Sequence, residues 1–455
     1  MYARTADFKN GAAKLPAPEL ADSRPRASGP GQSVVSVNAL VENFPPEKRV
    51  FLFLQGPHGS FFPRLGRVLQ SHGHHVLRIN FNGGDRATWG GQIDYVGRES
   101  RWPDYIARFL GDRQVTDLVV YGDCRPKHVL AIRAAKAIAV RVHVFEEGYI
   151  RPDWVTLERD GVNGNSTLSR DPQWYVERAR NLPPVPSFPP IESFQTARGW
   201  GAFFYYAEFV LQYWRFPFHR SHRPSDPVAE GVEWLRRFQR RKEEYARAEA
   251  ALNNLQTADY VIFPLQLDSD YQIRLHSDFR GMRPAIVKVM ASFADRAPAT
   301  MRLAVKEHPL DAGLNDWRKI TMEEAHRFGV ADRVDFIEHG DLLQLVRRAH
   351  GMVTVNSTAG TLALIEGKPV AVMGNAVYDI AGITHQSGLD QFWRHAQAPD
   401  QHIFDAFYRV LVDRCLLRGA FLSDAGIGML IDTAVARLSA DREAENIPAA
   451  QTIAL

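Results

Sequence analysis

The apolar residues of this chain fall into short runs that alternate with segments of helical periodicity from residue 49 onward. The first four runs cover residues 49–54, 75–79, 117–121 and 141–145. Each run is followed by a polar loop that contains glycine, as expected where a buried strand ends. Strands separated by helical segments of roughly 10 to 15 residues imply right-handed crossovers and a parallel sheet. The pattern therefore predicts a Rossmann-like domain over residues 48–195.

The same alternation returns in the second half of the chain. Predicted strands cover residues 260–264, 302–305, 334–337, 352–355 and 369–373, and predicted helices cover residues 280–294, 315–328, 341–349 and 359–366. This pattern predicts a second Rossmann-like domain over residues 255–400. The predicted fold class is α/β, with two Rossmann-like domains and a cleft between them. The helical patterns within residues 401–455 could pack against either domain.

Two segments depart from this alternation. Residues 1–47 are rich in Ala, Pro, Gly and Ser and show little periodicity, so we expect a mostly disordered leader. Residues 196–254 predict a helical connector whose first part is aromatic and ends in a basic cluster at residues 219–223. Its aromatic residues are Trp200, Phe203, Phe204, Tyr205, Tyr206, Phe209, Tyr213, Trp214, Phe216 and Phe218.

This aromatic segment has two interpretations. Aromatic rings beside cations are typical of a membrane interface, whereas an ordinary core helix produces the same apolar stripe. The charged helix that follows, over residues 228–251, adds a second basic group that is either a solvated face or a lipid contact. That group consists of Arg236, Arg237, Arg240, Arg241 and Lys242.

The composition changes this picture mainly by what it excludes. A formal net charge of +3 is too small to indicate a nucleic-acid partner. Cys124 and Cys415 cannot form a disulfide framework and lack metal-ligand spacing, which favours a reducing compartment. The chain shows no signal-peptide pattern, and no apolar run reaches the roughly 18 residues of a spanning helix. We therefore expect a cytoplasmic protein.

Candidate chemistry begins at residues 266–270 (Gln-Leu-Asp-Ser-Asp), directly after a predicted buried strand. Open α/β sheets place ligands at this carboxyl end of their strands. Gln266 could position a hydroxyl or carboxylate, and a carboxylate there could act as base, nucleophile or metal ligand. The structural alternative is that Asp268, Ser269 or Asp270 simply caps the next helix.

Residues 306–309 (Lys-Glu-His-Pro) follow the next predicted strand. Lys306 and His308 suit an anionic phosphate or carboxylate, and His308 could donate a proton or a hydrogen bond to a leaving phosphate. Pro309 would make this loop rigid. A turn with a solvated histidine is the structural alternative.

Residues 356–358 (Asn-Ser-Thr) follow another predicted strand and open a helix. Small hydroxyl residues at a helix start expose backbone N–H groups that suit phosphate, although capping selects the same residues. Glu366, at the far end of that helix, could hold ribose hydroxyls. The chain has no G-x-G-x-x-G and no Walker lysine, so dinucleotide and P-loop chemistry are not indicated.

The first domain contributes polar strand ends of its own. Its candidates for contacting acceptor hydroxyls are Gln55, Asn82, Asp85, Glu146, Glu147 and Tyr149. Ordinary structural turns explain the glycines of these loops equally well.

Two Rossmann-like halves, with phosphate-suited loops in the second, describe the GT-B architecture of nucleotide-sugar glycosyltransferases. The chain resembles the capsule polysaccharide biosynthesis and export proteins of the KpsS/LipB type, bacterial enzymes that look like retaining β-Kdo transferases. The resemblance covers about residues 49–421. It rests on the strings at residues 53–57, 78–85, 121–126, 144–154, 263–270, 306–309 and 355–358.

The resemblance implies roles for two motifs. The family's Gln-x-x-x-Asp motif falls on Gln266 and Asp270, and its Lys-x-His-Pro motif falls on Lys306, His308 and Pro309. Asp270 would be the catalytic carboxylate, and His308 would contact the CMP phosphate. The donor would be CMP-Kdo. The acceptor would be a lysophosphatidylglycerol-type lipid or a Kdo primer on it. The resemblance implies no metal or other cofactor.

Further expectations follow from that chemistry. A retaining transfer can use Asp270 as nucleophile, with Glu146 or Glu147 as the acceptor base. Gln266, Lys306 or Arg274 could hold the carboxylate of Kdo itself. Such an enzyme would work on the inner face of the cytoplasmic membrane, with other capsule assembly proteins as possible partners. A GT-B transferase for another nucleotide sugar, and a non-enzymatic assembly or export factor, remain alternatives.

Overall fold

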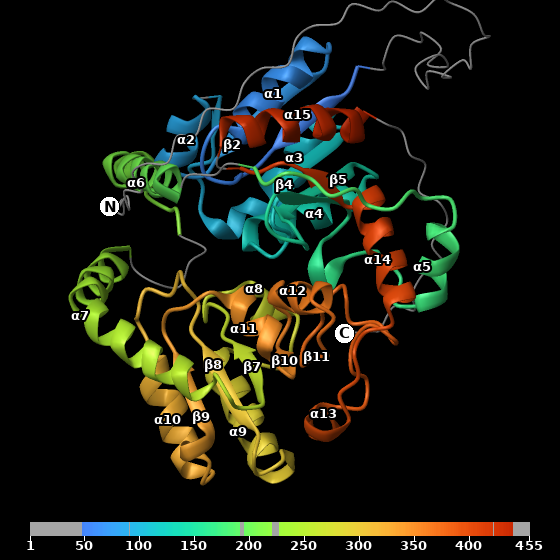
Figure 1. Ribbon diagram of the computed structural model, residues 1–455. Coiled ribbons are helices and arrows are strands. Elements are labelled where there is room, and N and C mark those ends of the chain that lie inside the picture. The colour runs from blue at the N-terminus through green and yellow to red at the C-terminus, as the bar shows by residue number, and fades with distance from the viewer. Residues whose placement is uncertain (1–47, 91, 192–194, 221–226, 422, 440–455) are drawn as a thin grey trace, which may run out of the picture. The chain divides into compact units, whose positions relative to one another are not determined.

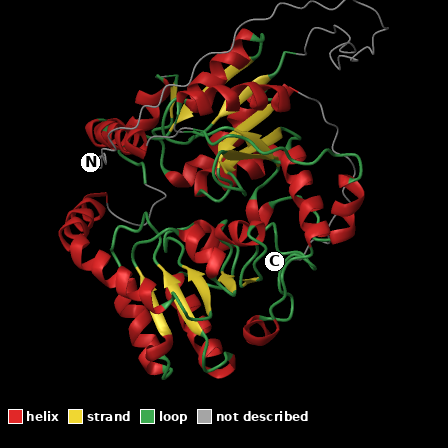
Figure 2. Cartoon of the chain, viewed as in Figure 1, coloured by secondary structure: helices red, strands yellow, loops and turns green. Residues whose placement is uncertain are grey.

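The computed structural model describes residues 48–90, 92–191, 195–220, 227–421 and 423–439. The predicted leader over residues 1–47 lies outside them. The described chain contains two β-sheets, each flanked by helices (Figures 1 and 2).

The first sheet follows the alternation of the N-terminal half. Its strand order is β12-β6-β5-β4-β1-β2-β3. The strands are β1 (Val50–Phe53), β2 (His75–Asn80), β3 (Ile93–Asp94), β4 (Asp117–Tyr121), β5 (Arg141–Glu147), β6 (Trp154–Arg159) and β12 (Leu416–Arg418). Neighbouring strands among β1 to β5 pair in parallel, whereas β6 and β12 are antiparallel additions.

Alternating side chains of these strands feed two separate cores. Phe51 and Phe53 pack with α1 and α15 on one face, and Leu52 and Leu54 pack with α3 and α4 on the other. Such strands are apolar on both faces, as expected for a covered parallel sheet. The helices of this half are α1 (Phe61–Ser71), α2 (Gly83–Trp89), α3 (Trp102–Asp112), α4 (Pro126–Ala137), α5 (Pro172–Ala179) and α15 (Asp424–Ser439).

The second sheet is parallel throughout, in the order β11-β10-β7-β8-β9. Its strands are β7 (Tyr260–Pro264), β8 (Arg302–Lys306), β9 (Val334–Ile337), β10 (Gly351–Thr354) and β11 (Val370–Val372). The helices of this part of the chain are α8 (Tyr271–Leu275), α9 (Met282–Arg296), α10 (Trp317–Arg327), α11 (Leu342–Arg348), α12 (Ala359–Ile365) and α13 (Leu389–His395). Every predicted strand of this half is confirmed within one residue at each end.

The connector forms α6 (Gln195–Leu211), the 3₁₀ turn η3 (Tyr213–Arg215) and α7 (Pro227–Asn254). Helix α6 packs on α2 of the first half, and α7 packs on β9 of the second. Further 3₁₀ turns are η1 (Glu99–Arg101), η2 (Asn163–Asn165) and η4 (Ala331–Arg333).

The C-terminal segment returns to the first half, which the sequence left open. Helix α14 (Gln401–Arg414) packs on α5, β12 extends the first sheet beside β6, and α15 packs on α1. The expectation of a purely parallel first sheet is therefore incomplete. Strand β12 has three residues, too few for a periodic signal, and its partner lies more than 250 residues away.

Two Rossmann-like halves with a C-terminal return confirm the predicted GT-B-like α/β class. No helix among the described residues combines the length and apolar character needed to cross a bilayer.

Candidate active site

Residues 266–270 and 306–309 follow the adjacent strands β7 and β8, at the same edge of the second sheet. Strands β7 and β8 pair in parallel through Pro264 and Lys306. The backbone N–H of Leu265 then donates to the carbonyl of Lys306 at 2.8 Å. Strand β10, on the other side of β7, delivers Asn356 to the same edge. Parallel pairing thus gathers residues that lie up to 90 positions apart.

Gln266 connects two of these strand ends. Its side-chain amide donates to Asn356 Oδ1 at 3.0 Å, and its Oε1 accepts from the backbone N–H of Asn356 at 3.1 Å. The Gln266 side chain also hydrogen-bonds to Asp270. Asn356 in turn donates to the carbonyl of Gln272 at 2.8 Å. A buried amide therefore orients the carboxylate that the sequence selected.

Asp270 is both a helix cap and a partly exposed carboxylate. Its Oδ1 accepts from the backbone N–H of Gln272 at 2.9 Å, which caps α8. Burial raises the pKa of Asp270, and its hydrogen bonds and the charges of Arg151 and His276 oppose that rise. Capping uses one carboxylate oxygen for one backbone bond, so it does not exclude chemistry at the other.

Asp268 caps a helix, which is the structural role that the sequence offered for it. Its Oδ1 accepts from the backbone N–H of Met282 at the start of α9, at 2.8 Å. Its other oxygen lies 4.0 Å from the Arg274 guanidinium, which places Arg274 beside this loop.

Glu146 brings a second carboxyl group from the first half. It belongs to strand β5 and not to the following loop, because β5 extends to Glu147. Burial raises the pKa of Glu146 to about 7, and the negative charges of Glu147 and Asp270 act in the same direction. The Glu147 N–H and Arg125 oppose the rise. The structure therefore brings Asp270 and Glu146 into one electrostatic environment.

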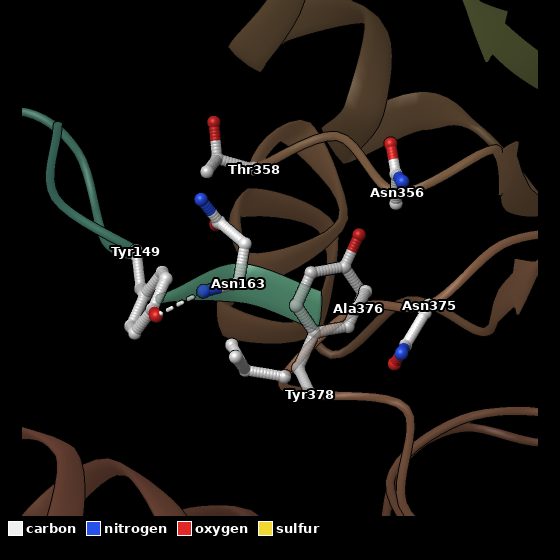
Figure 3. Close-up of a pocket in the computed structure, with 8 residues that line it drawn as sticks. Tyr149, Asn163, Asn356, Thr358, Asn375, Ala376 and Tyr378 are labelled. Carbon is white, nitrogen blue, oxygen red and sulfur yellow. Dashed lines mark hydrogen bonds between the residues drawn. The ribbon is translucent and has the colours of Figure 1, made fainter. Parts of the chain in front are cut away.

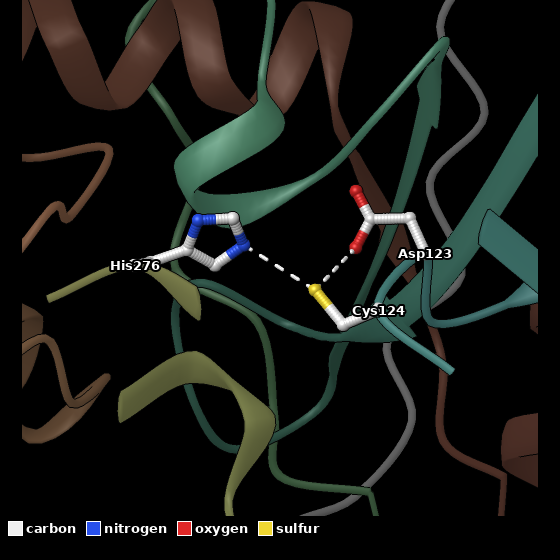
Figure 4. Close-up of side chains that lie close together, drawn as sticks. All are labelled: Asp123, Cys124 and His276. Carbon is white, nitrogen blue, oxygen red and sulfur yellow. Dashed lines mark hydrogen bonds between the residues drawn. The ribbon is translucent and has the colours of Figure 1, made fainter. Parts of the chain in front are cut away.

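A thiol and an imidazole join the two halves beside these carboxyl groups (Figure 4). Cys124 Sγ lies 3.3 Å from His276 Nε2 and 3.2 Å from Asp123 Oδ1. Burial and the charges of Asp123, Glu146 and Asp270 raise the pKa of the Cys124 thiol, so it is neutral. The sequence did not indicate His276 as a site residue, because it follows the five-residue helix α8 and not a strand.

Within the part of the chain that the structure describes, Asp123, Cys124 and His276 form one group whose ligand atoms are close enough to share a metal ion. Asp123 Oδ2 already accepts from Val162 N–H at 2.9 Å and from Asn165 Nδ2 at 3.0 Å. The Cys124 thiol donates to Asp123 Oδ1, which accounts for their contact as a hydrogen bond.

A small pocket lies next to Asn356, lined from both halves of the chain (Figure 3). Its residues are Tyr149, Asn163, Asn356, Thr358, Asn375, Ala376, Val377 and Tyr378. The amides and hydroxyls can recognise a polar ligand edge. Asn375 follows β11, so the strand-end rule could have found it, whereas Asn163 begins the short 3₁₀ turn η2 and Tyr378 lies in a loop, neither of which follows a sequence pattern.

Tyr149 is part of the wall of this pocket rather than a free acceptor contact. Its hydroxyl donates to Glu158 and accepts from the backbone N–H of Asn163 at 2.7 Å. Its carbonyl accepts from Thr361 Oγ1 of the second half at 2.7 Å. Ser357 stabilises the start of α12, because its hydroxyl accepts from the N–H of Ala359 at 3.1 Å.

The Lys-x-His-Pro string presents its residues in different environments. Lys306 is buried, and its Nζ donates to the carbonyls of Glu307 at 2.9 Å and Glu338 at 3.3 Å. Burial lowers the pKa of Lys306 to about 8. His308 is half-buried, with Nδ1 accepting from the N–H of Leu310 at 3.1 Å, and Pro309 is exposed.

Four predicted residues are placed elsewhere. Glu366 lies at the C-terminal end of α12 and pairs with Arg347 at 3.1 Å, away from the helix start that carries Thr358. The seven residues of α12 separate these two positions, as the sequence indicated. The other three, Gln55, Asn82 and Asp85, are buried beneath Tyr205 of α6.

A model of the family described as capsule polysaccharide biosynthesis protein matches residues 116–422. The chain is 36% identical to the capsule polysaccharide export protein KpsS of Escherichia coli, over 78% of this chain and 92% of that protein. It is 32% identical to the capsule polysaccharide modification protein LipB of Neisseria meningitidis serogroup A, over 86% and 96%. The chain belongs to the capsule polysaccharide biosynthesis protein family.

The family match begins at β4 and ends near α15, so it includes Asp123, Glu146, Asp270 and Lys306. Among solved structures, a chain of Thermosulfurimonas dismutans KpsC, a β-Kdo 2,7 transferase, aligns with a TM-score of 0.41 and 14% identity. That alignment covers 85% of this chain and 100% of the other.

Proposed function

We propose that this capsule biosynthesis protein transfers β-Kdo from CMP-Kdo, with retention, to a (lyso)phosphatidylglycerol-type lipid or to a Kdo primer on that lipid. The observation that carries the proposal is that the charge of Asp270 acts on the pKa of Glu146, although these two partly exposed carboxyl groups come from different halves. A retaining transfer requires one carboxylate as nucleophile and one base for the acceptor. The names of the relatives, which refer to capsule polysaccharide export and modification, agree with such a product.

The first step is attack by Asp270 on the anomeric carbon of Kdo. The bond from that carbon to the CMP phosphate oxygen breaks, and its electron pair leaves with CMP. In the second step the acceptor hydroxyl gives its proton to Glu146 and attacks the same carbon. The bond to Asp270 breaks, which restores the carboxylate, and two inversions produce retention.

The remaining residues bind and neutralise charge. Lys306 and His308 stabilise the leaving phosphate, because charge-assisted hydrogen bonds strengthen as negative charge develops there. Gln266, together with Arg274, holds the carboxylate of Kdo. Asn356, Ser357 and Thr358, at the strand end and helix start beside Gln266, contact the nucleotide. This mechanism assigns no metal ion or other cofactor to the reaction.

The direct test is mass spectrometry of a defined lipid acceptor after incubation with the protein and CMP-Kdo, with CMP release measured in parallel. We expect a mass increase equal to one or more Kdo residues and matching CMP release. Product formation from another nucleotide sugar, with none from CMP-Kdo, would contradict the donor assignment. Failure to bind any nucleotide in calorimetry, with no product, would show a non-enzymatic assembly factor instead.

A further inference from the structure

Helix α6 turns an apolar face away from the domain that carries it. Phe203, Phe204, Val210 and Leu211 have exposed fractions of 59%, 62%, 65% and 68%. Their spacing of one, seven and eight residues places them on one side of the helix. A helix on the surface of a globular protein normally has charged or polar residues on this side. In α6 this outward side carries apolar residues instead.

The opposite side of α6 is fixed by polar and close backbone contacts. The Tyr205 hydroxyl donates to Asp85 at 2.9 Å and accepts from Gln55 at 2.7 Å. Glycines of α2 lie directly beneath: a Cβ on Gly83 would stand 2.2 Å from the Glu208 carbonyl, and one on Gly84 2.6 Å from that of Tyr205. These contacts set the rotation of the helix, so its outward face is a consequence of specific packing.

The turn after α6 continues the apolar surface and adds positive charge. Trp214 is 75% exposed and Tyr213 55% exposed, whereas Phe216 is buried and anchors the turn. Arg220 is exposed beside them, and so is Arg215, whose guanidinium pairs with Asp94 at 2.8 Å. Glu208 is the one acidic residue in the sequence between positions 201 and 220. Burial lowers the pKa of His219 to about 4, so that side chain adds no charge at neutral pH.

We propose that this outer aromatic face, formed by Phe203, Phe204, Val210, Leu211, Tyr213 and Trp214, docks on a bilayer that contains anionic phospholipid. Tyr and Trp favour the headgroup region, apolar side chains enter the acyl boundary, and neighbouring arginines attract anionic lipid. Within residues 201–220 of the sequence Glu208 is the one acidic residue, and the exposed Arg220 supplies the charge that favours an anionic surface over a basic protein partner. The inference deepens the proposed function and rests on it for its meaning, because docking would bring the protein to a lipid-borne acceptor.

Sedimentation of the full-length protein with vesicles tests the inference without any sugar donor. We expect binding to phosphatidylglycerol-containing vesicles, weaker binding to pure phosphatidylcholine vesicles, and weakening by salt because screening reduces the attraction to arginine. The triple variant Phe203→Ser, Phe204→Ser and Trp214→Ser should lose at least about tenfold in vesicle affinity. The matched control is Ile138→Ser with Met429→Ser, which removes two apolar side chains that are 52% and 51% exposed, one directly after α4 and one on α15.

Several results would overturn the inference. One is failure of the wild-type protein to sediment with anionic vesicles, and another is equal binding by the triple variant. A third is a wild-type dimer that the triple variant converts to a monomer, without vesicle binding, which would make the face a contact between copies. Circular dichroism and transfer to a detergent-solubilised acceptor show whether each variant is folded. Since vesicle binding needs no CMP-Kdo, its failure is separable from failure of the transferase proposal.

Discussion

Polar residues follow the strands of both sheets, but the two groups have different environments. In the first sheet, Gln55, Asn82 and Asp85 are buried and share the hydroxyl of Tyr205. In the second sheet, Gln266 and Asn356 orient Asp270, which stays partly exposed. The polar residues of the first sheet hold helix α6 in place, whereas those of the second sheet are available to a ligand.

The difference shows that a polar strand end is only a candidate site. Hydrogen-bonding groups at a strand end must find partners, and another part of the chain can supply them as well as a substrate can. Helix α6 supplies them in the first sheet. Glu146, at the end of β5, is not among the partners of the Tyr205 hydroxyl and remains partly exposed, and the charge of Asp270 acts on its pKa.

The largest effect should come from Asp270→Asn. Asparagine retains an oxygen that can cap α8, but it cannot form the glycosyl intermediate. We expect kcat for Kdo transfer to fall by at least about 10³-fold with little change in melting temperature. The control Asp268→Asn keeps its bond to Met282 and should leave kcat within about threefold. Activity of Asp270→Asn within tenfold of wild type would remove Asp270 from the chemistry.

The next effect should be a changed pH profile in Glu146→Gln. A base must be deprotonated, so with a pKa of about 7 for Glu146 the transfer rate should rise as pH increases through 7. The variant should lose about 10²-fold in kcat/KM and also lose this rise. Glu147→Gln is the neighbouring control. A wild-type rate independent of pH between 6 and 8 would contradict the assignment.

A smaller change is expected in CMP affinity for Lys306→Met. The pKa of Lys306 is lowered to about 8, so its positive charge is present below that value and is lost as pH rises through it. Wild-type CMP binding should weaken across that range, whereas the variant should bind about tenfold more weakly at pH 7 and show no such step. Calorimetry from pH 7 to 9 measures both, with the exposed Lys319→Met as control. Equal affinity in the variant would show that Lys306 is purely structural.

The smallest effect concerns the covered group of the first sheet. Tyr205→Phe removes the hydroxyl shared by Gln55, Asn82 and Asp85, and it should lower the free energy of unfolding by about 1–3 kcal/mol. CMP affinity should not change. Urea unfolding measures the loss, and Tyr213→Phe on the exposed turn is the control. Weaker CMP binding with normal stability would mean that the covered group belongs to the site after all.

Regular elements were predictable because their signals are local. Strands such as β4 and β7 match the predicted residues, since a buried parallel strand needs a short apolar run and a polar end. The position of Lys306 beside Gln266 also followed from this logic. Strand β12 and the contact of Cys124 with His276 did not, because each joins residues more than 150 positions apart without a local pattern.

The sequence by itself determined two α/β halves, the strand ends that carry Asp270 and Lys306, and an aromatic connector. Only the tertiary structure decided which polar strand ends are covered, which carboxyl group acts on the pKa of another, and which side of α6 faces outward. The physical reason is that side-chain periodicity depends on neighbours within a few residues. Coverage and pKa depend instead on segments that packing brings together from distant parts of the chain.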